Sequence, residues 1–255
     1  MIKKRNTLNW RVSMESYLGF SEIYDELIGE DIDYRRIASF ILSETAQRNL
    51  YLDLGCGTGT LSLIVGEHFR ETYLVDLSSD MLTLAVDKFT EGNVPHKDFA
   101  LSMNEISFPV KFNLITSSID AINYILEEEE VQTLFTKVYE HLEEDGVFIF
   151  DVNSAYKIRE ILGSRDYVYT REDLAYTWEN YYEDDIVEMA LNFFIKRGDL
   201  YERIEEIHEE RAYEVDSLRK MLEKAGFKEI IICEDYSRNS ITDVSERITF
   251  IVRKR

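Results

Sequence analysis

Short apolar runs alternate with amphipathic stretches along most of the chain, which is the pattern of a parallel α/β sheet. Five of these runs predict strands, at 49–54, 72–76, 94–99, 112–117 and 147–152. Helices are expected before and between the strands, at about 14–48, at 60–69, from Ser78 onward and at 131–142. Gly146 fits the position of a stop for the last of these helices.

The alternation breaks after residue 153. Residues 154–212 are rich in tyrosine and acids and contain β-like runs such as 191–196, so they predict an inserted antiparallel sheet. A helix at 216–225 and strands at 229–233 and 248–253 then restore the pattern. We therefore expect a mostly parallel seven-stranded sheet with helices on both faces, formed by 1–153 and 213–255, and a small lid formed by 154–212.

The net charge of −21 limits the partners. Affinity for nucleic acid comes largely from Lys and Arg that neutralise phosphates, so such an acidic chain disfavours nucleic-acid substrates. No apolar run approaches the length of a membrane span, and polar residues follow the basic start where a signal peptide would be apolar. A cytoplasmic protein is expected, and the sequence predicts no oligomeric state. Cys56 and Cys233 lie too far apart for a metal-ligand spacing, so we expect no metal site.

The segment Asp53-Leu54-Gly55-Cys56-Gly57-Thr58-Gly59 carries the clearest chemistry. It lies between a predicted strand and a predicted helix, where glycines allow a sharp turn and a close approach of ligand to backbone. Ligands of open α/β sheets bind beyond the carboxyl ends of the strands. The glycines follow G-x-G-x-G, whereas dinucleotide enzymes use G-x-G-x-x-G and phosphate loops need Gly-Lys-Ser/Thr.

An acid follows the next strand. Asp76 lies 21 residues after Gly55, where a carboxylate can accept hydrogen bonds from both hydroxyls of a ribose. The alternative is that Asp76 only caps the helix that begins at Ser78.

With both elements in view, the sequence resembles class I S-adenosylmethionine-dependent methyltransferases, which have a Rossmann-like fold. The segments Val75–Leu82, Asp120–Ile125 and Gly146–Asn153 strengthen the resemblance. Tyr17–Leu27 and His208–Tyr213 look like a bacterial subgroup that acts on small molecules and carries an inserted β-lid. The resemblance implies the cofactor S-adenosylmethionine, the product S-adenosylhomocysteine and a small-molecule acceptor.

The resemblance also implies residue roles. Asp53, Gly55, Cys56, Gly57 and Gly59 would hold the methionine part of the cofactor, and Asp76 its ribose. The remaining cofactor contacts would come from Asp98 and Phe99 at the adenine, Leu77 or Met81 on its face, and Ser117 and Ser118 near its centre. For Asp98 the alternative is an exposed loop acid.

The acceptor pocket is predicted from position alone. Asp120 and Asn123 follow a strand whose end faces the cofactor, and Tyr17 and Tyr24 share one helical face, which is also core spacing. His208 is a candidate base, although a single histidine in a charged stretch is more often a solvated surface residue. Aromatic residues of 154–212 can line the pocket or simply form the core of a small sheet.

The sequence gives less support to two other functions. An NAD-dependent dehydrogenase is disfavoured by the glycine spacing, and a non-catalytic cofactor-binding or protein-interaction module is disfavoured by the intact glycine loop.

Overall fold

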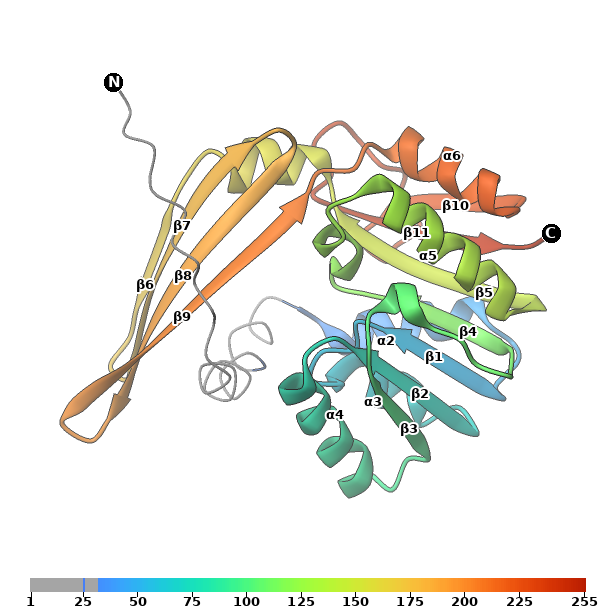
Figure 1. Cartoon of the computed structure of the whole chain (residues 1–255), viewed down its shortest axis with the longest axis horizontal. Coiled ribbons are helices and arrows are strands. Elements are labelled where there is room, and N and C mark those ends of the chain that lie inside the picture. The colour runs from blue at the N-terminus through green and yellow to red at the C-terminus, as the bar shows by residue number, and fades with distance from the viewer. Residues whose placement is uncertain (1–24, 26–31) are drawn as a thin grey trace.

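The computed structural model describes Asp25 and residues 32–255, and Figure 1 shows two sheets that lie apart. The large sheet has the strand order β10-β11-β5-β4-β1-β2-β3. Its strands are β1 (Leu50–Leu54), β2 (Glu71–Asp76), β3 (His96–Ala100), β4 (Phe112–Ser117), β5 (Leu142–Asn153), β10 (Glu229–Glu234) and β11 (Arg247–Arg253). Neighbouring strands from β3 to β5 are parallel, whereas β11 is antiparallel to both β5 and β10.

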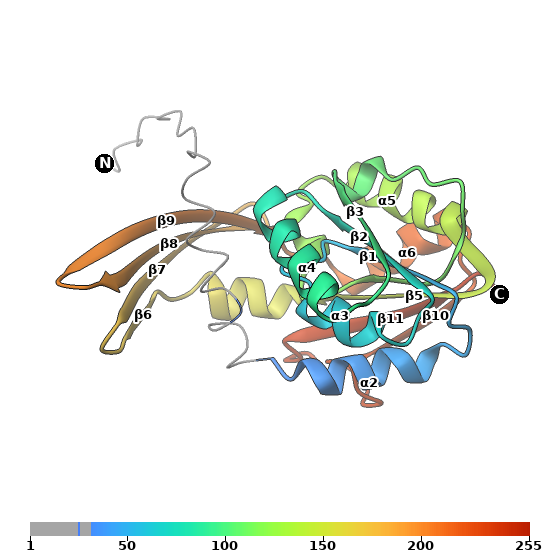
Figure 2. The same ribbon diagram turned by 90° about the horizontal axis from the view of Figure 1, so that it is seen from below.

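Helices cover both faces of the large sheet, as Figure 2 shows for α2 and α5. One face packs against α2 (Tyr34–Glu44), α3 (Thr60–Gly66) and α4 (Ser79–Glu91). The other face packs against α5 (Glu128–His141) and α6 (Val215–Ala225). Side chains alternate along each strand, so Tyr51 faces the first group while Leu52 faces the second.

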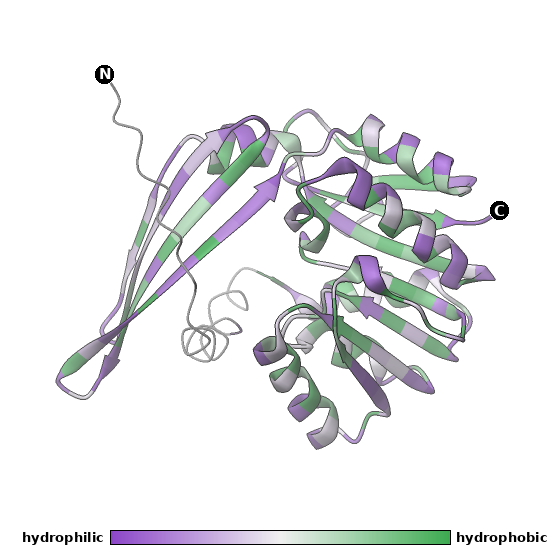
Figure 3. Ribbon diagram, viewed as in Figure 1, coloured by the Kyte–Doolittle hydropathy of each residue, from purple (hydrophilic) through white to green (hydrophobic). Residues whose placement is uncertain are grey.

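The small sheet is antiparallel throughout, in the order β6-β7-β8-β9. Its strands are β6 (Tyr167–Thr170), β7 (Leu174–Glu183), β8 (Ile186–Arg197) and β9 (Leu200–Arg211). Figure 3 shows that β8 is rich in apolar residues whereas β9 is largely hydrophilic. A short helix, η3 (Lys157–Leu162), precedes the sheet and was not expected from the sequence.

The fold class is confirmed: a mostly parallel seven-stranded sheet with helices, plus a separate four-stranded antiparallel sheet. The expectation for Gly146 was wrong. The helix α5 ends at His141, and Leu142 already starts β5, so Gly146 lies inside that strand. A Cβ at Gly146 would meet the carbonyl oxygen of Phe112 at 2.9 Å, so the glycine is needed for the close approach of β4 and β5.

None of the helices in the described part of the chain is both long and apolar enough to cross a membrane. The expected helix at 14–48 is described only in its last part, as α2. Tyr17 and Tyr24 lie outside the described residues.

Candidate active site

The glycine bend joins β1 to α3 at the carboxyl edge of the sheet. Gly55, Gly57 and Gly59 have φ angles of 72°, 53° and 75°, a region that side chains with a Cβ rarely adopt. At Gly55 and Gly59 there is also no room, because an added Cβ would lie 2.8 Å from the Cβ of Ala121 and 2.7 Å from that of Ala85. At Gly57 no atom lies within 4 Å of an added Cβ. The bend is therefore packed on its inner side and open above Gly57.

Asp76 holds this bend from the neighbouring strand. Its Oδ2 accepts a hydrogen bond from the backbone N–H of Gly57 at 2.7 Å, and its Oδ1 accepts one from the N–H of Ser78 at 2.9 Å. Burial raises the pKa of the Asp76 carboxyl, and the backbone bonds oppose that rise. The helix cap itself is Ser78, whose side chain accepts from the N–H of Met81. Asp76 therefore bonds the backbone just before α4, as the capping alternative expects, and it also contacts the glycine bend.

The side chain of Asp53 is buried. Its carboxylate accepts hydrogen bonds from the hydroxyls of Ser62 and Thr116, the latter at 2.5 Å, and the residue is only 4% exposed. Burial raises the pKa of Asp53. The carboxylate therefore ties β1 to α3 and β4 while it borders the crevice described next.

A small crevice of about 50 Å³ lies over the bend. Its walls include Asp53, Gly55, Cys56, Gly57, Thr58, Ser118 and Ile119. The buried hydroxyls of Ser117 and Ser118 make no hydrogen bond within the described residues, so each has capacity for a ligand. Burial raises the pKa of the Cys56 thiol well above its usual value, which keeps this wall residue uncharged. Open backbone and unpaired hydroxyls at the end of a parallel strand fit a small polar ligand.

Asp25 and Lys88 were missed by sequence reasoning. The Asp25 carboxylate accepts hydrogen bonds from the hydroxyls of Thr58 and Thr60 and forms an ion pair with Lys88 of α4. The Asp25–Thr60 distance is 3.2 Å. An anion thus lies beside the glycine bend, and no motif of the sequence indicated this contact.

The four residues expected around the adenine lie in the loop after β2, in α4 and in β3. Leu77 is 78% exposed beyond the end of β2, and Met81 is partly buried in the first turn of α4. Asp98 lies inside β3, which continues to Ala100. Phe99 turns the opposite way and stacks on Tyr73 with ring centroids 5.7 Å apart.

Asp98 is exposed and points to the opposite face of the sheet from Phe99, because side chains alternate along a strand. Phe99 instead belongs to the core on the α5 side of the sheet. Neither of these two neighbours lines the crevice over the glycine bend.

A second, much larger cavity of about 1060 Å³ lies between the two sheets. Its walls come from the carboxyl ends of β4 and β5, from the loop that follows β10, and from the face of the small sheet that includes Tyr176, Met189 and His208. Its volume is at the upper end of the range for small-molecule sites. Ile119 lines both this cavity and the small crevice, so the two spaces meet at that residue.

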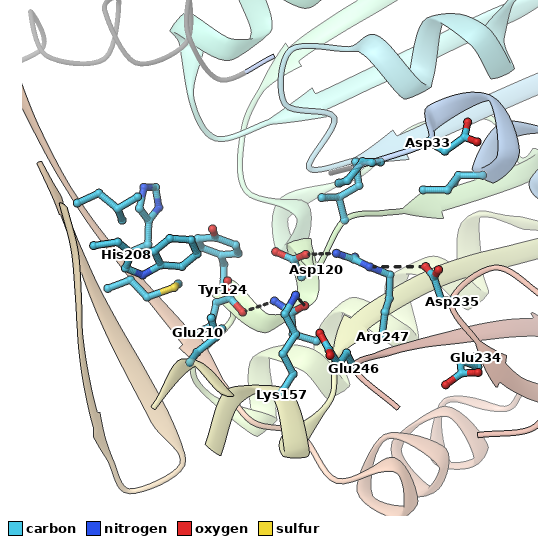
Figure 4. A pocket seen from close by; sticks show the side chains of 18 of the residues that line it. Asp33, Asp120, Tyr124, Lys157, His208, Glu210, Glu234, Asp235, Glu246 and Arg247 are labelled. Atoms are coloured by element: carbon cyan, nitrogen blue, oxygen red, sulfur yellow. Dashed lines mark hydrogen bonds and ion pairs between the residues drawn. The ribbon is translucent and has the colours of Figure 1, made fainter. Parts of the chain in front are cut away.

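Asp120 lines the large cavity beside Ile119, and both residues have positive φ angles of 54° and 58°. The buried carboxylate of Asp151 supports this unusual backbone by accepting the N–H of Ile119 at 2.6 Å and that of Asp120 at 3.1 Å. Arg247 then bridges the two acids, with a bond of 3.0 Å to Asp120 and an ion pair with Asp151. Figure 4 shows Arg247 between Asp120 and Asp235 on the cavity wall.

Asn123 lies behind the cavity and does not line it. The residue is fully buried, and its amide nitrogen donates to the carbonyl oxygens of Asn153 at 3.1 Å and Arg211 at 2.8 Å. Its Oδ1 accepts from the N–H of Asn153 at 2.9 Å. Two of these bonds reach the end of β5 and one reaches the end of β9, so Asn123 links the two strand ends in a positioning role.

His208 lies on the cavity wall and is not a solvated surface residue. Its ring contacts that of Tyr124 edge to face, with centroids 5.9 Å apart, and burial lowers its pKa. Glu210, two residues further along β9, is 3% exposed and accepts a hydrogen bond from the side-chain nitrogen of Asn153 at 2.7 Å. Glu210 and Arg247 were missed, because an acid or an arginine in a charged segment carries no sequence signal for burial.

No group of three or more potential metal ligands occurs among the residues that the structure describes. The candidate site combines a glycine bend, a carboxylate at the end of the next strand, and a large cavity beside them.

This arrangement defines a Rossmann-like nucleoside-binding domain, and comparisons with known proteins narrow the class. A family model described as a methyltransferase domain matches residues 52–146. A Geobacillus sp. (strain WCH70) protein named as a methyltransferase is 34% identical over 247 residues, 94% of this chain and all of that protein. The crystal structure of an S-adenosylmethionine-dependent methyltransferase from Clostridium acetobutylicum ATCC 824 has a TM-score of 0.88 at 37% identity, covering 93% of this chain and 98% of that one.

The chain therefore belongs to the S-adenosylmethionine-dependent methyltransferase family, and its cofactor is S-adenosylmethionine. A dTDP-3-amino-3,4,6-trideoxy-alpha-D-glucopyranose N,N-dimethyltransferase of Streptomyces venezuelae is also similar, with 29% identity over 136 residues, 51% of this chain and 56% of that protein. These findings confirm the methyltransferase interpretation against the dehydrogenase and non-catalytic alternatives.

Proposed function

We propose that this methyltransferase transfers the methyl group to a small molecule held in the large cavity between the two sheets. The observation that carries the proposal is the position of Ile119, which lines both that cavity and the crevice over the glycine bend. A methyl donor seated at the bend would thus face an acceptor seated in the cavity. The size of the cavity, about 1060 Å³, suits a small molecule and not a folded macromolecule.

The described residues fit the cofactor. The open backbone at Gly57 gives the methionine part room beside Asp53, Gly55, Cys56 and Gly59. The carboxylate of Asp76 can exchange a backbone hydrogen bond for the ribose hydroxyls, and the unpartnered hydroxyls of Ser117 and Ser118 can donate to the cofactor near its centre.

At the adenine end the proposed contacts are Asp98, which would accept from the amino group, and Leu77 and Met81, which would flank the ring. The large exposure of Leu77 leaves its side chain available for such a contact. Phe99 would act indirectly, by packing β3 against the core on the opposite face.

The sulfonium of S-adenosylmethionine supplies an activated methyl group, so this chain has to position the acceptor in line with it. Positioning can supply roughly 7–11 kcal/mol of a barrier in favourable cases. The backbone of Ile119 and Asp120, fixed by Asp151, forms the floor at which the two spaces meet. Tyr124 and the small sheet line the same cavity and would limit the access of water to the reacting atoms.

Relatives and charge also support a small acceptor. The similar Streptomyces venezuelae enzyme is named for a nucleotide-linked amino sugar. Acids predominate on the cavity wall, with Asp33, Asp120, Glu210, Glu234, Asp235 and Glu246 against Arg36, Lys157 and Arg247. Such a wall disfavours the phosphates of a nucleic acid.

The test is to incubate the protein with methyl-labelled S-adenosylmethionine and a cell extract, and then to separate small molecules from protein and nucleic acid by dialysis. The proposal predicts label in the dialysable fraction. Label confined to protein or nucleic acid, or no transfer although the cofactor binds, would reject it. The same reaction with the Asp76→Ala variant should give little label in the dialysable fraction, because the substitution weakens cofactor binding.

A further inference from the structure

Three titratable residues alternate along β9. Glu206, His208 and Glu210 share one face of the small sheet, because successive side chains of a strand point to opposite sides. The residues between them point outward: Ile207 is 54% exposed and Glu209 is exposed as well. Two members of the set, His208 and Glu210, line the large cavity.

The Glu210 carboxylate is buried on the wall of the large cavity. The residue is 3% exposed, and one carboxylate oxygen accepts from Asn153, whose own Oδ1 accepts from the ammonium of Lys157 at 2.9 Å. Burial raises the pKa of Glu210 to about 8, and the charge of Asp120 acts in the same direction. A cation that enters the cavity would favour the ionised carboxylate and would thus be bound by it.

The surroundings of His208 keep its imidazole neutral. Met189 is its cross-strand neighbour on β8, and the ring of Tyr124, from the short helix that follows β4, contacts it edge to face. Burial lowers the pKa of His208, so at neutral pH the ring can accept a proton. His208 and Glu210 lie two residues apart on one face, so a single small ligand can reach both.

The arginines of the cavity wall are already matched by acids. Arg36 pairs with Asp235 at 2.7 Å, and Arg247 pairs with Asp120 and Asp151. The remaining acids of the wall therefore leave an excess of negative charge for a ligand to neutralise. A neutral or anionic acceptor would not use this excess.

We propose that the acceptor is a small amine, which enters as an ammonium ion bound by Glu210 and passes a proton to His208 before its nitrogen attacks the methyl group. This inference rests on the proposed function, since it names the acceptor class for the same cavity. Glu210 and His208 are then binding and catalytic residues of the acceptor half of the site.

The protons and electrons balance. The ammonium N–H bond breaks and its proton goes to the ring nitrogen of His208, which leaves a lone pair on the amine nitrogen. That lone pair forms the new N–C bond as the C–S bond breaks, and the sulfur keeps the electron pair of the broken bond. The product leaves as a methylated ammonium ion, and His208 releases one proton to water.

The groups that face the two residues come from four elements. On β9 itself the neighbour is Glu206, and Tyr124 faces His208 from η2 (Ala121–Tyr124). Around Glu210 the charges belong to Asp120, Lys157 and Arg247. Below the pKa of His208 the imidazole is protonated and cannot act as base, so activity should rise with pH through that value.

The experiment uses the full chain, 13C-methyl S-adenosylmethionine and the dialysable fraction of a cell extract, with the labelled methyl carbons assigned by NMR. The proposal predicts N-methyl carbons. O-methyl or C-methyl carbons would overturn the amine assignment while leaving the proposed function intact. If no fraction contained a labelled product, both the proposed function and this inference would be rejected.

Variants then test the two residues with the unmethylated amine that this labelled product identifies as the acceptor. Glu210→Gln should raise the acceptor KM about 10- to 100-fold, because a hydrogen bond to a charged group is lost. His208→Gln should lower kcat about 100-fold or more and abolish the rise of activity with pH. The matched controls are Glu209→Gln and His68→Gln, which are exposed in the structure.

The affinity for S-adenosylhomocysteine, measured by calorimetry, should be unchanged in all four variants. Controls and test variants with the same KM, kcat and pH profile would overturn the proposal. Unfolded test variants would be recognised by lost S-adenosylhomocysteine binding, and His208→Asn and Glu210→Asp would then be measured in their place. If His208→Asn kept the pH profile of the native protein, His208 would be rejected as the general base.

Discussion

The carboxylate of Asp76 accepts a hydrogen bond at 2.7 Å from the backbone N–H of Gly57, across two neighbouring strands of the sheet. The contact places the carboxylate that is predicted to bind the ribose directly against the glycine bend that is predicted to hold the methionine part. Two motifs that lie about 20 residues apart in sequence are thus one structural unit. The proposed cofactor site depends on this unit.

Replacement of Asp76 by Ala should weaken the binding of S-adenosylhomocysteine. The ribose would lose its charged hydrogen-bond acceptor, and Gly57 its support, so we expect a loss of about 2–3 kcal/mol, or roughly 30- to 150-fold in Kd. Calorimetry measures the Kd directly. Asp87→Ala, on the exposed side of α4, is the matched control, and equal Kd values for the two variants would contradict the assigned role.

Gly57 and Gly198 offer a test of the open bend. Both have positive φ angles, 53° and 68°, and an added Cβ would meet nothing within 4 Å at either position. Ala at each site should therefore cost a similar backbone strain of about 1–2 kcal/mol in the free energy of unfolding, measured with urea. Only Gly57→Ala should weaken S-adenosylhomocysteine binding. If Gly198→Ala weakened it equally, the open space above Gly57 would have no part in binding.

Replacement of Asn123 by Ala should destabilise the protein. The change leaves the carbonyl oxygens of Asn153 and Arg211 and the N–H of Asn153 without partners in a buried place. We expect a loss of about 2–4 kcal/mol in the free energy of unfolding, measured by urea denaturation. Asn49→Ala, at an exposed position before β1, should change it by less than about 0.5 kcal/mol. Equal losses in both variants would argue against the positioning role.

Glu206 makes stability depend on pH. Burial raises the pKa of its carboxyl to about 7, above the ordinary value of 4.5, so folding favours its protonated form. The contribution of the protonated Glu206 carboxyl to the free energy of unfolding is then fully present below about pH 4.5. It is lost as the pH rises through 7. Relative to Glu206→Gln, the native protein should lose about 1–3 kcal/mol between pH 5 and pH 8. Urea unfolding at both pH values measures this difference, and the exposed Glu209→Gln is its control. A constant difference between native protein and Glu206→Gln would contradict the burial effect.

Much of the large sheet could be predicted from the sequence, because buried parallel strands are nearly continuous apolar runs. The run at 112–117 coincides with β4, and the glycine bend follows β1 as expected. The start of β5 could not be predicted, because Leu142 continues the apolar pattern of α5 and a glycine after a helix is typical of a helix stop.

The cofactor half of the site was easier to predict than the acceptor half. Glycine spacing and a strand-end acid are local signals, and they indicated Gly57 and Asp76 before the structure was known. Contacts between distant segments leave no such signal. The bonds of Asn123 to Arg211, of Asp25 to Thr60 and of Arg247 to Asp120 join residues that only the fold brings together.

The most direct measurement is a crystal structure of the protein with S-adenosylhomocysteine. We predict the amino acid part over Gly57, the ribose hydroxyls within hydrogen-bond distance of the Asp76 carboxylate, and the sulfur directed past Ile119 toward the large cavity. A ligand bound elsewhere, with Asp76 still bonded only to Gly57 and Ser78, would contradict the account.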